Sequence, residues 1–195
     1  PAMNQEKFNI IYVFGDAIAK AEAASVASAK INAKYINEFK AQNVAGYIPA
    51  KNKSESFIVF TAHYDHIGMM GAKTRFDGAS DNASGTSAML TLMQHYAQHP
   101  LENHNVLFVA CAAEEAGLIG AFRYADAELV NMKDIKFLIN LDIWGDATDG
   151  IAVVNGKVFE KEFQWVKEAN EAIGVNGKGF FKEIRQGDEA TNSDH

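Results

Sequence analysis

The chain has 195 residues, 48% of them hydrophobic and 22% charged, which is typical of a globular protein large enough to bury a core. Its net charge of −7 and its scattered arginines, Arg75, Arg123 and Arg185, argue against a nucleic-acid-binding surface, which needs a basic patch. No apolar run approaches the roughly 20 residues of a membrane-spanning helix. The single cysteine, Cys111, excludes a disulfide framework and reads as a buried core residue.

The first 43 residues carry few structural signals, and we treat them as an N-terminal segment. Residues 9–14 predict a short buried strand, residues 17–29 an Ala-rich helix with little to bury, and residues 31–35 alternate like a second strand. The chain begins with Pro1, which indicates a processed or trimmed start, and no signal peptide is recognisable there.

From residue 44 onward, apolar strands alternate with helical stretches. Strands are predicted at residues 44–48, 57–62, 106–112, 135–141, 151–154 and 180–184, and helices at residues 84–99, 118–127 and 158–173. This alternation predicts an α/β fold with a largely parallel sheet covered by helices on both faces. Ligands bind beyond the C-terminal ends of the strands in such sheets, so the residues that follow each strand are the candidates for a site.

Two candidate residues follow the first buried strand, and a third precedes a helix. His63 and Asp65 are two residues apart, so in an extended chain they point to the same side. That arrangement suits a metal-bound imidazole whose orientation is fixed by a carboxylate. Asp81 lies in a run of small and polar residues before the helix at 84–99, where it either caps the helix or offers a carboxylate that bridges two metal ions.

Three further carboxylates follow the next two strands. Glu114 and Glu115 come directly after residues 106–112, and because adjacent side chains point in different directions, one can bind a metal while the other faces a substrate water. Asp142 lies between Leu141 and Ile143, where a lone buried charge would be very costly. No Lys or Arg is close to Asp142 in sequence, so a metal cation is its natural partner.

These motifs occur in the same order as those of a known family. The runs 63–66, 78–85, 114–120, 140–142 and 193–195 resemble the metal-binding blocks of the M28 family of zinc peptidases. The resemblance implies a three-layer α/β/α fold with a mixed, mostly parallel β-sheet, and it identifies residues 44–195 as a zinc peptidase catalytic domain.

The resemblance also implies a set of metal ligands. Five residues match ligands of the family: His63, Asp81, Glu115, Asp142 and His195. Asp81 matches the carboxylate that bridges two zinc ions. His63 and Asp142 complete one ion, and Glu115 and His195 complete the other.

Two residues match catalytic positions of the family. Glu114 matches the general base that takes a proton from a water bound by both zinc ions, and Asp65 matches the acid that orients His63. The implied cofactor is Zn²⁺, two ions per complete protein, although carboxylate-rich sites also admit Mn or Co. The implied partner is a peptide with a free N-terminus, whose first peptide bond is hydrolysed; the oligomeric state stays open.

Several alternatives remain at this point. A carboxypeptidase on the same fold would hold the substrate carboxylate with Arg75 or Arg185, a glutaminyl cyclase would use one metal, and a peptidase-like interaction domain would be inactive. Four apolar side chains either line a substrate pocket or, as we favour from the sequence, pack in the core: Met69, Met70, Trp144 and Phe180.

The sequence departs from the family pattern at its end. It stops at the last matched ligand, His195, where the family normally continues with further strand, loop and helix. We therefore expect a C-terminally incomplete domain with weakened metal binding on the His195 side. Peptidases of this family are often exported, so we favour an extracytoplasmic location, either periplasmic or secreted.

Overall fold

The computed structural model describes residues 13–26, 28, 30, 36, 38–145, 148–174 and 178–195. It divides into two compact units, Pro1–Lys40 and Ala41–His195. The described part of the first unit holds helix α1 (Ala17–Glu22), which buries none of its residues. This helix is shorter than the predicted 17–29, because a helix without an apolar face in contact with other elements gains little from extension. The strand predicted at 31–35 lies outside the described residues, as does most of the one at 9–14.

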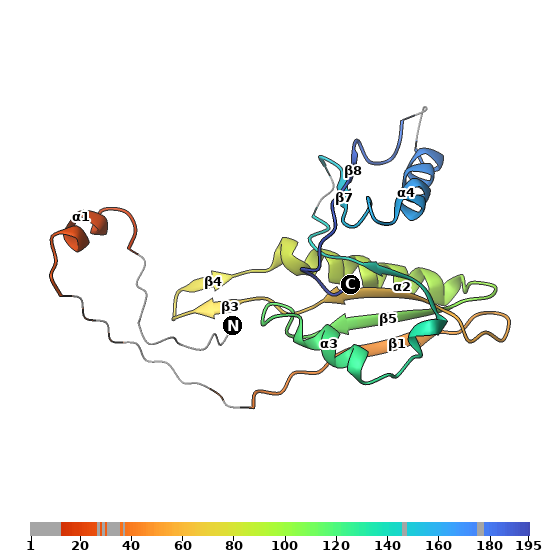
Figure 1. The fold of residues 1–195 in the computed structure, drawn as a ribbon, viewed down its shortest axis with the longest axis horizontal. Coiled ribbons are helices and arrows are strands. Elements are labelled where there is room, and N and C mark those ends of the chain that lie inside the picture. The colour runs from red at the N-terminus through yellow and green to blue at the C-terminus, as the bar shows by residue number, and fades with distance from the viewer. Residues whose placement is uncertain are drawn as a thin grey trace. The chain divides into compact units, whose positions relative to one another are not determined.

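A four-stranded sheet forms the centre of the second unit, in the order β1-β5-β2-β6 (Figure 1). Its strands are β1 (Val44–Ile48), β2 (Phe57–His63), β5 (Asn105–Cys111) and β6 (Ile135–Asn140). Strands β5, β2 and β6 run parallel, and β1 is antiparallel to β5. The mixed, mostly parallel sheet predicted from the sequence is therefore confirmed.

Helices cover both faces of this sheet, as the alternation of strand side chains requires. On one face, Phe60, Ala62, Val106 and Phe108 form a buried cluster with Met89 of helix α2 (Gly85–Gln98). On the other face, Val59, Leu107, Val109 and Cys111 form a second cluster, against which helix α3 (Ile119–Asp126) packs Ala121 and Tyr124. The central strands β2 and β5 are therefore continuous apolar runs, because both of their faces are buried.

Shorter elements complete the described part of the second unit. A hairpin of β3 (Gly68–Met70) and β4 (Thr74–Phe76) and a helical segment η1 (Ala79–Ser84) lead from β2 to α2, and the Asp81–Asn82 peptide bond in η1 is cis. The 3₁₀-helix η2 (Met132–Asp134) precedes β6. The parallel pair β7 (Ile151–Val153) and β8 (Ile184–Gln186) flanks helix α4 (Glu160–Ala172) in the chain. No helix in the described part of the chain is both long and apolar enough to cross a membrane.

One strand prediction is wrong. The strand predicted at 180–184 begins only at Ile184, because helix α4 binds the preceding backbone instead. The Phe181 N–H donates to Asn170 Oδ1 over 2.6 Å, and the Phe180 N–H donates to the Asn170 carbonyl over 3.1 Å. The strand β2, in contrast, runs one residue past its predicted end and carries His63 as its last residue.

Candidate metal centre

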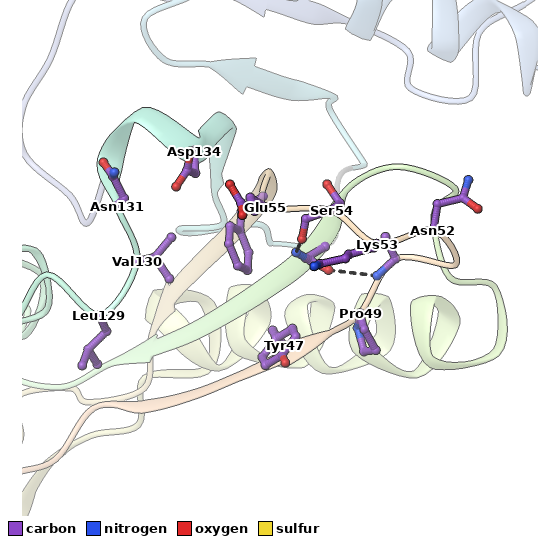
Figure 2. A pocket seen from close by; sticks show the side chains of 13 residues that line it. Tyr47, Pro49, Asn52, Lys53, Ser54, Glu55, Leu129, Val130, Asn131 and Asp134 are labelled. Carbon is purple, nitrogen blue, oxygen red and sulfur yellow. Dashed lines mark hydrogen bonds between the residues drawn. The ribbon is translucent and has the colours of Figure 1, made fainter.

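Two hollows lie at different places along the sheet in the part of the chain that the structure describes. The larger, of about 490 Å³, lies where β2 and β5 begin and is lined by Phe57, Asn105, Tyr47 and Leu129 among others (Figure 2). The smaller, of about 280 Å³, is lined by Asp65 and other residues that follow the end of β2. The chemistry predicted from the sequence lies at the end of the sheet next to the smaller hollow, so we build the site there.

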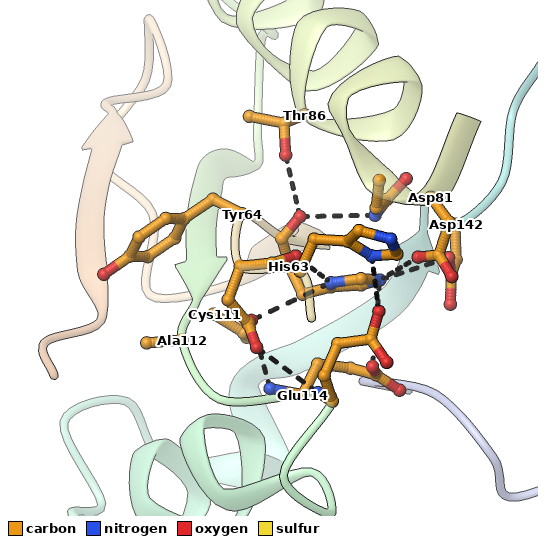
Figure 3. Close-up of polar contacts among 12 residues, drawn as sticks. His63, Tyr64, Asp81, Thr86, Cys111, Ala112, Glu114 and Asp142 are labelled. Carbon is orange, nitrogen blue, oxygen red and sulfur yellow. Dashed lines mark hydrogen bonds and ion pairs between the residues drawn. The ribbon is translucent and has the colours of Figure 1, made fainter. Parts of the chain in front are cut away.

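Three carboxylates converge on the imidazole of His63, which is 1% exposed at the end of β2 (Figure 3). Its Nε2 atom lies 3.2 Å from Asp81 Oδ1, 3.3 Å from Asp142 Oδ1 and 3.9 Å from Glu114 Oε2. Asp142 follows β6, Glu114 follows β5, and Asp81 comes from η1. The parallel strands thus bring residues up to 79 positions apart onto one nitrogen atom.

The spacing of these atoms fits a zinc ion. Zinc binds nitrogen and oxygen ligands at roughly 2.0–2.2 Å in a tetrahedron, which places neighbouring ligand atoms about 3.4 Å apart. The distances from His63 Nε2 to Asp81 and to Asp142 are 3.2 and 3.3 Å. One atom each from His63, Glu114 and Asp142 lie within 4.8 Å of one another, so this group can hold a metal ion, and Asp81 lies beside it on His63.

A second group of donors lies beside the first. One atom each from His66, Asp81 and Glu115 lie within 4.8 Å of one another. His66 Nδ1 and Glu115 Oε1 form an ion pair at 2.6 Å, and neither atom has a further polar partner among the described residues. Because 2.6 Å is shorter than the spacing of zinc ligands, this pair must separate to admit an ion. Asp81 faces both groups and is the residue that connects them.

The structure places His195 away from both groups. Its exposed ring donates from Nε2 to the Ala190 carbonyl over 2.6 Å. Neither donor group found among the described residues contains His195. The preceding residues are fixed elsewhere: Ser193 binds Asp142, and Asp194 is buried, which turns the last ring back toward Ala190. The imidazole beside Glu115 is instead that of His66. His66 lies three residues after His63 and is not among the ligands predicted from the sequence.

Asp65 holds the loop that carries the glutamates. Its two carboxylate oxygens accept hydrogen bonds from the main-chain N–H groups of Glu114, at 3.1 Å, and Glu115, at 3.3 Å. The His63 Nδ1–H donates to the main-chain carbonyl of Asp65 over 3.1 Å, whereas the nearer carboxylate oxygen is 3.8 Å away. In this structure Asp65 therefore orients His63 through its backbone and the glutamate pair through its carboxylate.

A series of hydrogen bonds fixes the carboxylate of Asp142. Ser193 Oγ donates to Asp142 Oδ2 over 2.5 Å and accepts from Asn140 Nδ2 over 2.6 Å. Asn140 Oδ1 in turn accepts from the Thr61 hydroxyl on β2 over 2.7 Å. One oxygen of Asp142 is thus held by Ser193, and the other is left facing His63.

Burial and charge shift the pKa values of the groups in the first donor set. Burial alone would lower the pKa of His63, but the hydrogen bond with Asp142 and the charges of Asp142 and Glu114 outweigh it and raise this pKa to about 9. The bond from His63 holds the pKa of Asp142 below its usual value, against the effect of burial. Burial raises the pKa of Glu114 to about 7, with the His63 charge opposing.

The site carries far more negative than positive groups. Six carboxylates gather around two imidazoles: Asp65, Asp81, Glu114, Glu115, Asp142 and Asp194. Asp194 is 4% exposed, and its carboxylate oxygens have no hydrogen-bond partner of good geometry among the described residues. Burial raises its pKa to about 6, and burial together with the Asp194 charge raises the pKa of the Cys111 thiol to about 12. A buried thiol of that kind is a core residue and no nucleophile, and the excess of carboxylates favours bound cations.

The apolar residues proposed for a substrate pocket are not core residues. Met69 is 60% exposed, Met70 66%, Phe180 69% and Trp144 38%. The expectation that they pack in the core is therefore wrong. Of the arginines considered for a substrate carboxylate, Arg75 is already paired with Asp77.

Comparisons with known proteins identify the family of this chain. The model of peptidase family M28 matches residues 43–195. Aminopeptidase YwaD of Bacillus subtilis (strain 168) is 29% identical over 144 residues, which cover 73% of this chain and 30% of that protein. The crystal structure of BSAP, a zinc aminopeptidase from Bacillus subtilis, matches with a TM-score of 0.63 and 29% identity over 83% of this chain and 38% of that one. A glutaminyl cyclase from Bacteroides thetaiotaomicron matches at a TM-score of 0.60 and 21% identity, over 78% of this chain and 58% of that one.

The chain spans less than half the length of the two aminopeptidases. The matched residues nevertheless contain the whole central sheet and both donor groups. The likeness to the glutaminyl cyclase, at 21% identity, concerns the fold alone. On the match to its family model, which covers most of the sequence, the chain belongs to peptidase family M28.

Proposed function

We propose that the protein is an aminopeptidase that removes the N-terminal residue of peptides with two zinc ions and Glu114 as general base. The observation that carries this proposal is the convergence of Asp81, Asp142 and Glu114 on the Nε2 atom of His63. The aminopeptidases among the relatives support the reaction, because YwaD and BSAP share 29% of their aligned residues with this chain.

Two ions, rather than one, are favoured by the position of Asp81. It lies 3.2 Å from His63 in the first donor group and is itself a member of the second, so one carboxylate serves both. His63 and Asp142 complete the first group. Glu115 and an imidazole complete the second: His66 in this structure, and His195 in the prediction from the sequence. Divalent ions in such a site supply Lewis acidity, which lowers the pKa of water and polarises the scissile carbonyl.

Glu114 is suited to move the proton. Its pKa of about 7 places it where a general base works best at neutral pH. Its carboxylate lies 3.9 Å from His63, too far for a direct hydrogen bond, and so stays available to a water molecule. Asp65 fixes the backbone of Glu114, which holds the base over the donor groups. We propose that Glu114 takes a proton from the attacking water and passes it to the leaving amine.

The other functions considered from the sequence have less support. A carboxypeptidase needs a cation for the substrate carboxylate, and of the two arginines considered Arg75 is paired with Asp77, which leaves Arg185 on β8. The glutaminyl cyclase among the structural neighbours shares only the fold at 21% identity. An inactive interaction domain would not need a base with a pKa near neutrality beside two donor groups.

The test compares Glu114→Gln with Asp81→Ala after zinc loading and desalting. We expect Glu114→Gln to keep the zinc content of the parent and to lose about 10²–10⁴ in kcat on a peptide with a free N-terminus. Asp81→Ala should lose zinc as well as activity. An N-acetylated form of the same peptide should not be cleaved. Unchanged turnover in Glu114→Gln would refute the assigned base, and cleavage of the acetylated peptide would refute the aminopeptidase.

We propose that the catalytic unit is the region 44–195, and that the protein acts outside the cytoplasm. Its substrate is then a peptide with a free N-terminus, and the exposed Met69, Met70 and Phe180 offer apolar surface for the side chain of the first residue.

A further inference from the structure

The side chain of Asn82 makes four hydrogen bonds to the backbone around the donor groups. Its amide is 1% exposed, and its Nδ2 donates to the His63 carbonyl over 3.3 Å and to the Leu141 carbonyl over 2.9 Å. Its Oδ1 accepts from the N–H of Gly85 over 3.0 Å and of Ile143 over 3.2 Å. An amide side chain has two N–H donors and an oxygen with two lone pairs, so every bonding position of Asn82 is in use.

These four bonds join the segments that carry three proposed metal ligands. His63 is itself a ligand, and Leu141 and Ile143 are the residues on either side of Asp142. Asn82 directly follows Asp81 in the chain. One buried amide therefore connects the backbone at His63, Asp81 and Asp142, and His63 Nε2 lies 3.2 Å from Asp81 Oδ1 and 3.3 Å from Asp142 Oδ1.

The surroundings of Asn82 leave it little freedom to move. A Cβ atom added to Gly85 would lie 2.1 Å from the Leu141 carbonyl oxygen and 2.4 Å from Asn82 Oδ1, so α2 begins in close contact with both. The Thr86 hydroxyl also donates to the His63 carbonyl, over 2.8 Å. The amide is thus clamped between the ends of β2 and β6 and the first turn of α2.

We propose that Asn82 is a positioning residue that fixes the separation of His63, Asp81 and Asp142 before a metal ion binds. The proposal rests on the function proposed above. It follows from the geometry: a site whose ligands are already at zinc spacing loses less conformational freedom on binding, and groups that hold metal ligands in place typically change metal affinity 10–100-fold. Every bonding position of the Asn82 side chain is taken by a backbone group, so Asn82 acts only through the backbone of the ligands.

Asn105 provides a matched control at the other end of the sheet. It is also a buried asparagine, 7% exposed, whose Oδ1 accepts from the Ala50 N–H over 3.0 Å and whose Nδ2 donates to the Ser54 carbonyl over 2.9 Å. It lines the larger hollow, where β5 begins, away from the donor groups. Loss of its bonds should lower stability without touching the metal ligands.

The experiment compares Asn82→Asp and Asn82→Ala with Asn105→Asp and Asn105→Ala. The aspartates keep the acceptor oxygens but lose both N–H donors, and the alanines lose all side-chain bonds. Metal affinity is measured by competition with a chelator, and the visible spectrum of the Co²⁺-loaded protein reports ligand geometry. Circular dichroism sets a temperature at which each variant is folded. We expect the substitutions at Asn82 and those at Asn105 to lower the Tm of the metal-free protein. Only the Asn82 variants should lose about 10–100-fold in metal affinity and show a shifted Co²⁺ spectrum.

The outcomes separate this proposal from the one on function. If the parent protein binds metal and the Asn82 variants bind it as tightly as the Asn105 variants, the positioning role is refuted and the proposed function stands. If the parent binds no metal, both fall. Should the Asn82 variants not fold, Asn82→Ser, which retains one donor and one acceptor in a smaller side chain, is measured in their place, and unchanged affinity and spectrum in that variant overturn the role.

Discussion

In the folded, metal-free protein, His63 and Glu114 keep their protons to a higher pH than the same groups in an unfolded chain. His63 has a pKa of about 9 because Asp142 and Glu114 outweigh the effect of its burial, and Glu114 has a pKa of about 7 because of burial. Both values lie above those of the same groups in an unfolded chain. The metal-free folded state therefore binds more protons than the unfolded state at neutral pH, and it must release the His63 proton before a metal ion binds.

We predict that the metal-free protein becomes less stable as the pH rises from about 6.5 to about 9. A group with a raised pKa contributes its full stabilisation below its unfolded pKa and loses it as the pH passes the folded value, so the loss follows His63. Metal affinity should rise over the same range, about tenfold per pH unit for one displaced proton. Urea unfolding of the metal-free protein and chelator competition, each at several pH values, measure the two trends. A flat stability profile, or one shared by His63→Gln, would contradict the assignment.

Local pattern was sufficient to find most of the residues at the site, but not their bonds. The spacing of His63 and Asp65 predicted that the Asp65 carboxylate orients His63, whereas in the structure this carboxylate accepts from the N–H groups of Glu114 and Glu115, 49 and 50 residues away. The pairing of His66 with Glu115 could not be predicted, because no residue near His66 in the sequence indicates Glu115 as its partner. Contacts of that kind depend on strand order, which a single sequence does not reveal.

At the scale of elements, the join between η1 and α2 is the tightest point of the site. Gly85 starts α2 against the end of β6, with the Leu141 carbonyl oxygen at 2.1 Å from the position that a Cβ atom would take. That approach allows the helix to deliver Asp81 and Asn82 to the strand ends. The Leu141 carbonyl accepts from Asn82 Nδ2 and the Leu141 N–H donates to the Thr61 carbonyl of β2, so the backbone of Leu141 is held on both sides.

We predict that Gly85→Ala destabilises the protein by about 1–3 kcal/mol or more, because overpacking against backbone forces the helix away from β6. Gly46→Ala is the control, since a Cβ atom at Gly46 in β1 would meet nothing within 4 Å. Urea unfolding of both variants gives the difference in free energy. If the two substitutions cost the same, the close approach of α2 to β6 is not a constraint on the fold.

Element prediction succeeded where strands are buried on both faces and failed where they are short. Strands β2, β5 and β6 were predicted to within one residue at each end, because their apolar runs reflect contact with both helical layers, and the mostly exposed β1 was predicted to the residue. The hairpin of β3 and β4 was missed: its strands have three residues each and are mostly exposed, so no apolar pattern marks them. Yet this hairpin connects His63 to Asp81.

At the scale of the whole molecule, the central sheet and the donor groups belong to one of the two compact units. All four strands of the central sheet and both donor groups come from the unit Ala41–His195. The sequence placed the boundary between residues 43 and 44, at the start of the first regular strand. The structure places it between Lys40 and Ala41.

The three residues between these boundaries allow a sharp test. Asn43 donates to the Gly120 carbonyl over 2.7 Å and accepts from the Ala112 N–H over 3.0 Å, and the Gln42 carbonyl accepts from the Tyr64 hydroxyl over 2.6 Å. We predict that a chain beginning at Ala41 keeps the Tm and the metal affinity of the parent.

A chain beginning at Val44 should be less stable by about 1–3 kcal/mol, because the buried Ala112 N–H loses its partner. It should also bind metal more weakly, since Ala112 leads directly into Glu114 and Glu115, and Tyr64 lies between His63 and Asp65. Thermal unfolding of the two shortened chains measures their stability, and chelator competition measures their metal affinity. Equal stability would mean that the strand, and not Asn43, marks where the folded unit begins; a loss in the longer chain would mean that residues 1–40 support the site.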